Sequence, residues 1–329
     1  MVSIEEDMEM KKENTAHFEQ VKIQNKKAVR NLLREQSPLS IAKVAEEVGL
    51  SYPTVSALLK ELTIKGEALV SIESESCGGR PGICYELNPD YQYALTLRFD
   101  DDEICAGVYD AYGRRVRELS TLKADGEISP IDLVNYVRNV KAEFETLSAV
   151  SIGVAGTVYE DEITYLPKFP KLEGKQLSEL LKSELELEVF IENDINAVCY
   201  AEAREREDFA HIVYMEEDKC IGVGIVMNGE IVRGSHGYAG ELEYLCRDQT
   251  EVEEILTTAI LALTCVLNLP DLLLSGGGCS KTMIEHLDRR LKDILPCERV
   301  PKLYVIEKMN HYYEKGLIKR VLTKWACEE

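Results

Sequence analysis

The sequence predicts an α/β protein in which an N-terminal winged helix-turn-helix domain is followed by a two-lobed α/β body. Three observations support this fold class. Residues 41–60 have the pattern of two short helices joined by a tight turn, residues 69–87 have that of a β-hairpin, and the chain beyond Tyr91 alternates strands with helices. Strands connected by crossover helices are typical of α/β domains.

Residues 41–60 predict the helix-turn-helix itself. Ala45 is small where two helices cross closely, and Gly49 allows the backbone to turn. Ser40 and Ser51 stand where an N-cap is expected for each helix. Apolar residues at helical spacing can form a shared core: Val44, Val48, Leu50, Val55, Leu58 and Leu59. Many helical hairpins share this pattern, so a purely structural helix pair is the alternative.

The hairpin that follows is interpreted as a wing. Strands are expected at 69–73 and 83–87, joined by the glycine- and proline-rich segment 77–82. Arg80 lies at the tip, where a guanidinium can enter a narrow minor groove of DNA. The alternative is a structural arginine in a tight loop.

These elements predict binding to double-stranded operator DNA. A recognition helix over 52–62 is expected in the major groove, and a homodimer is expected to read an inverted repeat. The predicted DNA-binding residues are Ser51, Tyr52, Thr54, Ser56, Lys60 and Arg80. Further phosphate contacts are expected from Lys22, Lys26, Lys27, Arg30, Arg34 and Lys43.

The charge of the chain is distributed unevenly. The 329 residues carry a net charge of -21. Residues 11–88 hold eleven Lys and Arg against ten Asp and Glu, whereas residues 89–329 hold 27 against 45. DNA should repel the acidic body, so we expect only the N-terminal domain to dock, with an affinity that depends strongly on salt.

The composition favours a cytoplasmic protein without a membrane segment. No apolar run approaches the length that spans a bilayer, and the acidic start is unlike a signal peptide. The ten cysteines are scattered singly without a CxxC pair, which favours reduced thiols. Cys105, Cys199 and Cys265 lie in apolar runs, where a free cysteine behaves as a small buried apolar residue.

Hairpins followed by helices occur twice in the body, which predicts two lobes. The expected strands are 94–99, 103–109, 114–121, 149–154, 189–192, 211–214 and 272–274, with a further hairpin around Asn228-Gly229. The expected helices are 131–147, 177–185, 195–206 and 252–267. The expected domains are 15–88 for the winged helix-turn-helix, 89–192 for the first lobe, completed by a C-terminal helix at about 310–329, and 193–309 for the second lobe.

Several motifs occur in one order along the chain. They are Asn25-Lys26, the helix-turn-helix, Gly78-Gly79-Arg80-Pro81, the segment 192–197 (Glu-Asn-Asp-Ile-Asn-Ala), the segment 234–241 and Ser275-Gly276-Gly277-Gly278. This order resembles the DNA-binding branch of the ROK family (repressors, open reading frames and sugar kinases), from about Val21 to the C-terminus. The resemblance implies an actin- and hexokinase-like (ribonuclease H-like) body that holds a sugar in a cleft between its lobes.

The chain departs from the kinases of that family at both phosphate loops. The Asp-x-Gly-Gly-Thr hairpin of the kinases is replaced by 98–102, which is Arg-Phe-Asp-Asp-Asp. Carboxylates there would repel a triphosphate, and their side chains would block close backbone approach. The second loop begins with Asp218-Lys219-Cys220, although Gly222 and Gly224 remain. No ATP-dependent phosphorylation is expected.

The zinc cluster of the family is also missing from the sequence. Tyr244 stands at the position of its histidine, and only Cys246 follows. Because zinc needs about four sulfur or nitrogen ligands, we expect no metal and no other cofactor. His236 is expected to shape the cleft or to lie exposed.

Three predicted ligand-binding residues remain from the sugar site that the resemblance implies: Asn193, Asp194 and Glu241. In the kinases the aspartate is the general base, but without phosphate loops Asp194 would grip a hydroxyl instead. The alternative is that Asn193 and Asp194 cap the helix that begins at Ile195.

These features together predict a transcriptional regulator, most simply a repressor, of carbohydrate-related genes, with a sugar or sugar derivative as effector. One alternative is a regulator that senses no ligand and retains the body as a dimerisation scaffold. Another is a sugar kinase with an appended DNA-binding domain, which the altered phosphate loops disfavour.

Overall fold

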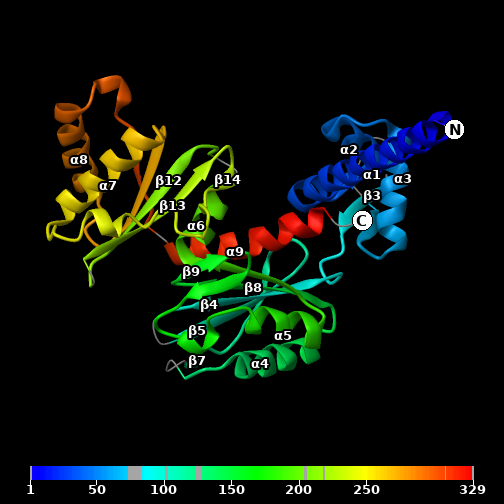
Figure 1. The fold of residues 1–329 in the computed structure, drawn as a ribbon. Coiled ribbons are helices and arrows are strands. Elements are labelled where there is room, and N and C mark those ends of the chain that lie inside the picture. Colours follow the sequence, from blue (N-terminus) through cyan, green and yellow to red (C-terminus); the bar gives the residue numbers. More distant parts are fainter. Residues whose placement is uncertain are drawn as a thin grey trace. The chain divides into compact units, whose positions relative to one another are not determined.

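The computed structural model describes residues 2–72, 83–100, 103–123, 127–203, 206–217, 219–307 and 309–327, with side chains from residue 19 onward (Figure 1). Contacts within the chain divide it into two compact units. The N-terminal unit comprises Met1–Ala94, Tyr109–Val116 and Val321–Glu329. The second unit comprises Leu95–Val108 and Arg117–Arg320. The N-terminal unit therefore includes two short segments, Tyr109–Val116 and Val321–Glu329, that lie beyond the expected boundary at residue 88.

The N-terminal unit begins with three helices, α1 (Val2–Gln36), α2 (Ile41–Val48) and α3 (Tyr52–Ile64). They are followed by strands β2 (Ala68–Ile72) and β3 (Ile83–Leu87), which pair antiparallel. A short strand β1 (Leu39–Ser40) pairs with the other edge of β3. Helix, helix, turn, helix and hairpin thus occur in the expected order. The connection between β2 and β3, including Arg80, lies outside the described residues.

Both expected helix starts are confirmed at atomic detail. The Ser40 and Ser51 hydroxyls accept hydrogen bonds from the backbone NH groups of Lys43 (3.3 Å) and Thr54 (3.4 Å). Gly49 ends α2 with φ of 67°, in the left-handed region that favours glycine. The core between the helices is formed by Val29, Leu33, Val44, Val55, Leu58, Leu59 and Leu62. This small core fixes how α2 and α3 cross.

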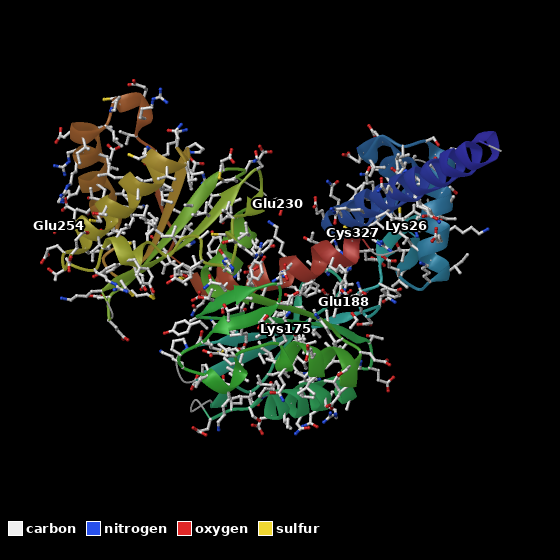
Figure 2. The ribbon with its side chains drawn as sticks, in the orientation of Figure 1. Lys26, Lys175, Glu188, Glu230, Glu254 and Cys327 are labelled. Atoms are coloured by element: carbon white, nitrogen blue, oxygen red, sulfur yellow. The ribbon has the colours of Figure 1, made fainter. Side chains whose placement is uncertain are left out.

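The expectation that Lys26, Arg30 and Arg34 contact phosphates is wrong. Lys26, labelled in Figure 2, is 3% exposed and donates to Glu61 at 2.6 Å. Arg30 is buried against Glu67, with Nη2 to Oε2 at 2.9 Å. Arg34 donates from Nε to the Ala111 carbonyl at 3.0 Å, and burial lowers its pKa to about 10. The face of α1 that carries these three side chains packs against the rest of the N-terminal unit, so their polar contacts are made within the unit.

One sheet of the body has the strand order β11-β8-β4-β5-β6, with β7 paired to β5. Its strands are β4 (Tyr93–Phe99), β5 (Glu103–Tyr109), β6 (Arg115–Glu118), β7 (Leu122–Lys123), β8 (Leu147–Val154) and β11 (Glu188–Asn193). Strands β8 and β11 are parallel, as a crossover helix between them requires. Two helices, α4 (Pro130–Glu143) and α5 (Gln176–Leu185), pack side by side next to this sheet (Figure 1).

The other sheet has the strand order β14-β13-β12-β15-β16. Its strands are β12 (Phe209–Met215), β13 (Cys220–Met227), β14 (Glu230–Ile231), β15 (Asp271–Gly276) and β16 (Lys302–Val305), and helices α7 (Val252–Val266) and α8 (Lys281–Ile294) accompany it. The expected turn at Asn228-Gly229 is confirmed, with φ of 53° and 75°. Two sheets with separate helices agree with the α/β class.

The remaining elements are the hairpin β9 (Thr157–Tyr159) and β10 (Glu162–Tyr165), helices α6 (Asp194–Glu202) and α9 (Met309–Ala326), and the 3-10 turns η1 (Pro170–Leu172), η2 (Leu242–Leu245) and η3 (Cys297–Arg299). Cys199 on α6 is buried as expected, whereas Cys265 on α7 is exposed, because it lies on the outer face of an amphipathic helix. None of the helices in the described part of the chain combines the length and apolar character that a membrane crossing needs.

Candidate ligand-binding site

The site begins where strand β11 ends and helix α6 starts. Glu192 and Asn193 lie opposite Gly153 and Val154 of the parallel strand β8. Side chains beyond the carboxyl ends of neighbouring parallel strands share one edge of a sheet, which is where α/β proteins place ligands. The sequence therefore positions Asn193 and Asp194 at this edge.

The loop from Gly234 to Glu241 lies against two different strands. A Cβ at Gly240 would come within 1.9 Å of the Val223 carbonyl on β13, and one at Gly237 within 2.5 Å of the Val158 carbonyl on β9. Both glycines also have positive φ, of 98° and 73°. Only glycine permits this close approach with these dihedral angles. The two contacts hold Glu241 close to the end of β11.

A cavity of about 210 Å³ in the second unit is lined by Asn193, Asp194 and Glu241 together. Thr157, Tyr165 and Asn196 contribute further polar groups to its wall. The structure thus brings Glu241 together with Asn193 and Asp194, which lie far from it in sequence. Their binding of a ligand stays a prediction.

Asn193 caps helix α6, as the alternative interpretation held. Its Oδ1 accepts hydrogen bonds from the backbone NH groups of Ile195 and Asn196, both at 3.0 Å. Its Nδ2 donates to the Gly156 carbonyl at 3.0 Å. An amide nitrogen carries two hydrogens, so one remains for a ligand. Most of the hydrogen-bonding capacity of Asn193 is therefore taken up by the protein, and its main role is to shape the cavity.

Asp194 and Glu241 are the charged groups with unusual pKa values in this cavity. Burial and, to a smaller extent, the neighbouring Glu241 carboxylate raise the pKa of Asp194 from 3.8 to about 6. Burial also raises the pKa of Glu241, with a contribution from Glu243. The described lining residues include these three acids and no Lys, Arg or His. Such a wall suits hydroxyl donors and disfavours anions.

We expect sugar affinity to rise with pH through about 6. The pKa of Asp194 is raised in the folded chain, to about 6, so this carboxyl is protonated below that pH and ionised above it. Sugar hydroxyls donate to the ionised form, so binding should weaken about tenfold between pH 7 and pH 5. The same shift means that Asp194 lowers stability as pH rises from about 4 to about 6. Titration calorimetry across this range tests the expectation, with Asp194→Asn as the control that lacks the Asp194 carboxyl; an equal slope in both proteins would contradict it.

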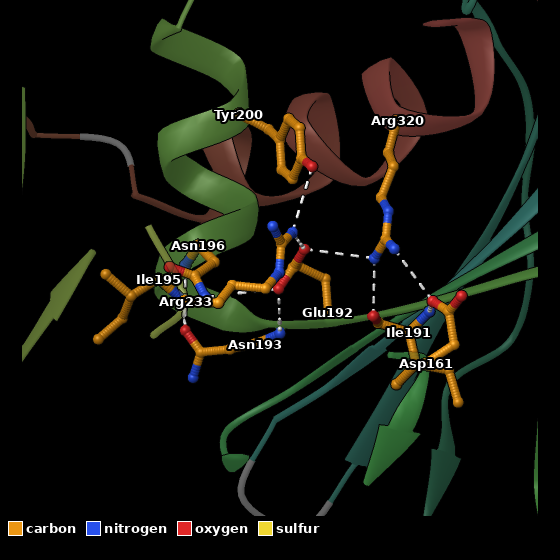
Figure 3. Close-up of polar contacts among 9 residues, drawn as sticks. All are labelled: Asp161, Ile191, Glu192, Asn193, Ile195, Asn196, Tyr200, Arg233 and Arg320. Atoms are coloured by element: carbon orange, nitrogen blue, oxygen red, sulfur yellow. Dashed lines mark hydrogen bonds and ion pairs between the residues drawn. The ribbon is translucent and has the colours of Figure 1, made fainter. Parts of the chain in front are cut away.

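A charge network centred on the buried Glu192 lies next to Asn193 at the end of β11 (Figure 3). Glu192 is 1% exposed, and its Oε1 accepts from the Asn193 backbone NH at 3.2 Å. Its Oε2 pairs with Arg233 at 2.5 Å and with Arg320 of α9 at 3.2 Å. Arg320 also donates to Asp161 at 3.0 Å. One carboxylate therefore joins strand β11, the loop that carries Glu241, and helix α9.

The network also shifts the pKa of Arg233. Burial alone would lower this pKa, but the Glu192 carboxylate and the Tyr200 hydroxyl together outweigh burial, and the pKa is raised. Arg233 further donates to the Tyr200 hydroxyl at 3.2 Å. Sequence reasoning singled out the segment around Glu192 for Asn193 and Asp194. It missed the ion pairs of Glu192 itself, because the two arginines come from distant segments.

The glycines kept from the second phosphate loop serve packing in this chain. A Cβ at Gly222 would lie 2.1 Å from Ile195, and one at Gly224 would lie 2.5 Å from the Cys199 sulfur. Both glycines therefore let α6 pack directly on strand β13. In the other loop, Arg98 pairs with Asp100 at 3.0 Å, and residues 101, 102 and 218 lie outside the described residues.

The positions compared with a zinc cluster have other surroundings. Cys246 is 3% exposed and packs in the apolar core of the second sheet. Tyr244 is exposed and stacks against Tyr238 (centroids 5.9 Å apart) and Arg247 (4.4 Å). His236 is exposed and bonds to Ser235 at 2.9 Å. Within the described part of the chain, no group of three or more His, Cys, Asp or Glu is arranged to hold a metal.

Among the candidate DNA-binding residues, Ser51, Tyr52, Thr54 and Ser56 lie at the N-terminal end of α3, and Lys60 lies in its C-terminal half. Ser51, Tyr52, Thr54 and Lys60 are exposed, and Ser56 is half-buried. The exposed face of α3 also includes Ala57 and Ile64, which sequence reasoning missed. Helical periodicity opposite Leu58 and Leu62 would have indicated both. Arg80 lies outside the described residues.

Comparison with known proteins agrees with this architecture. Residues 130–253 match the model of the ROK family. The xylose repressor of Staphylococcus xylosus is 29% identical over 232 residues, covering 67% of this chain and 59% of that protein. The DNA-binding transcriptional dual regulator NagC of Escherichia coli (strain K12) is 22% identical over 235 residues, covering 68% and 58%. The chain thus spans about three fifths of the length of these curated relatives.

A solved structure has a similar fold. It is described as a ROK family transcriptional regulator, homologue of the E. coli MLC protein, and it aligns with a TM-score of 0.72 at 16% identity. The alignment covers 93% of this chain and 98% of that one. At this identity the likeness shows the fold, an α/β architecture with a ROK-like body.

Proposed function

We propose that this protein is a sugar-responsive, DNA-binding repressor of carbohydrate-related genes and is not an enzyme. The observation that carries the proposal is the convergence of Asp194 and Glu241 on one cavity in a chain that also has an exposed recognition-helix face. Similarity to proteins named xylose repressor and NagC supports both halves. We infer that the protein acts in the cytoplasm as a homodimer that reads an inverted repeat.

The N-terminal unit would bind DNA as a winged helix-turn-helix. Helix α3 leaves Tyr52, Thr54 and Lys60 exposed, while Val55, Leu58 and Leu59 pack into the core. An exposed face on a rigidly packed helix can enter a major groove without rearrangement. With Lys26, Arg30 and Arg34 turned inward, few basic groups reach phosphates, so the affinity should be modest.

Lys60→Ala should weaken operator and non-operator DNA binding alike. Lys60 is exposed on α3 and has no ion-pair partner among the described residues. Loss of one phosphate contact lowers the slope of log affinity against log salt by about 1. Fluorescence anisotropy over a salt series measures this slope. Lys43→Ala is the matched control, because Lys43 is already paired with Glu46 and Glu47, at 3.1 and 2.8 Å; equal slopes for both variants would contradict the placement.

The effector is proposed to be a neutral sugar such as xylose. Three acids and no basic side chain among the described lining residues favour hydroxyl donors and repel a phosphate or carboxylate. A thermal-shift screen should therefore find stabilisation by free sugars and none by the corresponding sugar phosphates. Stabilisation by a phosphorylated sugar alone would contradict the effector class while leaving DNA binding intact.

The residues of helix α9 are divided between the two units. Its residues up to Arg320 belong to the second unit, where Arg320 pairs with Glu192. Its last turn belongs to the N-terminal unit, where the Ala326 carbonyl accepts from Arg30 at 3.2 Å. When one helix contributes residues to two units, a ligand that orders one unit can shift the conformational equilibrium of the other.

Two rival functions lead to different measurements. A sugar kinase would hydrolyse or transfer the γ-phosphate of ATP, which an ATP-consumption assay with the sugar panel detects. A regulator with a scaffold-only body would bind operator with an affinity that no sugar changes. The proposed function expects no ATP consumption and a sugar-dependent operator affinity.

A further inference from the structure

A second cavity, of about 430 Å³, lies beside the first in the same unit. Ala155, Asp194, Ile195 and Met215 line both cavities. A volume of this size falls within the range of roughly 300–1,000 Å³ that small-molecule sites occupy. The second cavity therefore shares part of its wall with the candidate sugar site.

The walls of the second cavity are mainly apolar. They include Phe99, Leu166, Phe169, Val213, Met309 and the ring of Tyr313. Phe99 and Phe169 meet edge to face with centroids 5.2 Å apart, so this aromatic wall is already packed. The described charged groups at its wall are two carboxylates, Asp100 and Asp194, and one exposed amine, Lys168. An apolar group fits these walls better than an anion does.

Tyr313 adds a hydrogen-bonding group to this wall. Its ring is 3% exposed and occupies the space over Gly153, where a Cβ would lie 2.4 Å from the ring. Its hydroxyl has no hydrogen-bond partner among the described residues. A buried hydroxyl without a partner is costly, so a ligand substituent or a water is expected to satisfy it.

We propose that the two cavities form one site for a glycoside, with the sugar ring in the first cavity and an apolar, aromatic aglycone in the second. This inference rests on the proposed function, because it assumes that the first cavity binds a sugar. Asp194 and Ile195 stand where the two parts of such a ligand join. A free sugar fills only the first cavity, whereas an aryl glycoside also covers the Phe99, Phe169 and Met309 surface.

The test compares matched methyl and phenyl β-D-glycosides of xylose and glucose by titration calorimetry with the full chain. For a sugar that binds, the phenyl glycoside should bind about tenfold or more tightly than the methyl glycoside, because its ring leaves water for an aromatic pocket. Methyl-labelled methionine provides a local probe. The Met309 signal, assigned with Met309→Leu, should shift with the phenyl glycoside and stay unchanged with the methyl glycoside.

Met309→Ala should remove most of the phenyl advantage and leave methyl glycoside affinity unchanged. Met309 is half-buried, so the chain should fold without its side chain. Met283→Ala is the matched control, because Met283 is a half-buried methionine on α8 that packs against the second-sheet core and is outside the lining of both cavities.

The outcomes separate this inference from the proposed function. Equal affinities of the two glycosides would overturn the second subsite and leave the sugar site standing. A phenyl advantage that persists in Met309→Ala, with an unmoved Met309 signal, would place the aglycone elsewhere and also overturn it. Failure of every glycoside and free sugar to bind would contradict the proposed function itself.

Discussion

Asp194→Ala is expected to remove the effect of sugar on operator binding at sugar concentrations that just saturate the original protein. The Asp194 carboxylate is the group of the cavity that burial and Glu241 hold at a raised pKa, so its hydrogen bond to a hydroxyl should be strong once formed. Loss of a hydrogen bond to a charged group costs about 1.5–3 kcal/mol, which lowers sugar affinity roughly 10- to 150-fold. Anisotropy with labelled operator, titrated with sugar, measures the response.

Operator affinity without sugar should be the same in Asp194→Ala as in the original protein. Asp194 belongs to the second unit, and the proposed DNA contacts belong to the N-terminal unit. Glu179→Ala provides the control for removal of a negative charge, because Glu179 is exposed on α5, outside the cavity. A full sugar response in Asp194→Ala would remove the pocket assignment and favour a body that serves only as a scaffold.

Glu192→Leu is expected to produce the largest loss of stability. It leaves Arg233 and Arg320 without the carboxylate that both arginines contact from a partly buried position. Breaking a buried pair from one side costs roughly 3–5 kcal/mol, and the partial exposure of both arginines favours the lower end. Differential scanning calorimetry should show a Tm about 6–12 °C lower for the transition of the second unit.

Two further variants separate charge from shape at this position. Glu192→Gln keeps the volume and can still accept hydrogen bonds, so it should lose less stability than Glu192→Leu. The double variant Glu192→Leu with Arg233→Met should recover part of the loss, because it removes one of the orphaned charges. If Glu192→Leu melted like the original protein, the network in Figure 3 would contribute nothing measurable to stability.

Much of the fold could be predicted because its signals are local. Ser40 and Ser51 cap helices that begin at the next residue, and Gly49 ends α2. The Asn228-Gly229 pair adopts the positive φ angles that a tight hairpin turn needs. The helix α8, the strand β16 and the β9–β10 hairpin were not predicted. Helix α8 has apolar residues at helical spacing, among them Met283, Leu287 and Leu291, so its signal was present and sequence reasoning missed it. The strands are three or four residues long and show no clear period.

The site could be predicted only in part, because its energetics depend on distant partners. The motif around Asn193 indicated the correct edge of the sheet, yet the sequence does not show that its amide oxygen is already used by α6. Likewise, Lys26, Arg30 and Arg34 have the spacing of a basic stripe on one face of α1, and this spacing is the same whether the face is exposed or packed inside the unit. Only packing against Glu61, Glu67 and Ala111 shows that the stripe faces inward.

The coupling between sugar and operator is tested most directly by measuring sugar affinity twice, without operator and with saturating operator. Linkage requires that operator change sugar affinity by the same factor by which sugar changes operator affinity. The account predicts weaker sugar binding to the operator complex, by a factor of about 5–150, which matches the shift seen in the anisotropy titration. Identical sugar affinities in both states would contradict the claim that the cavity of the second unit controls DNA binding.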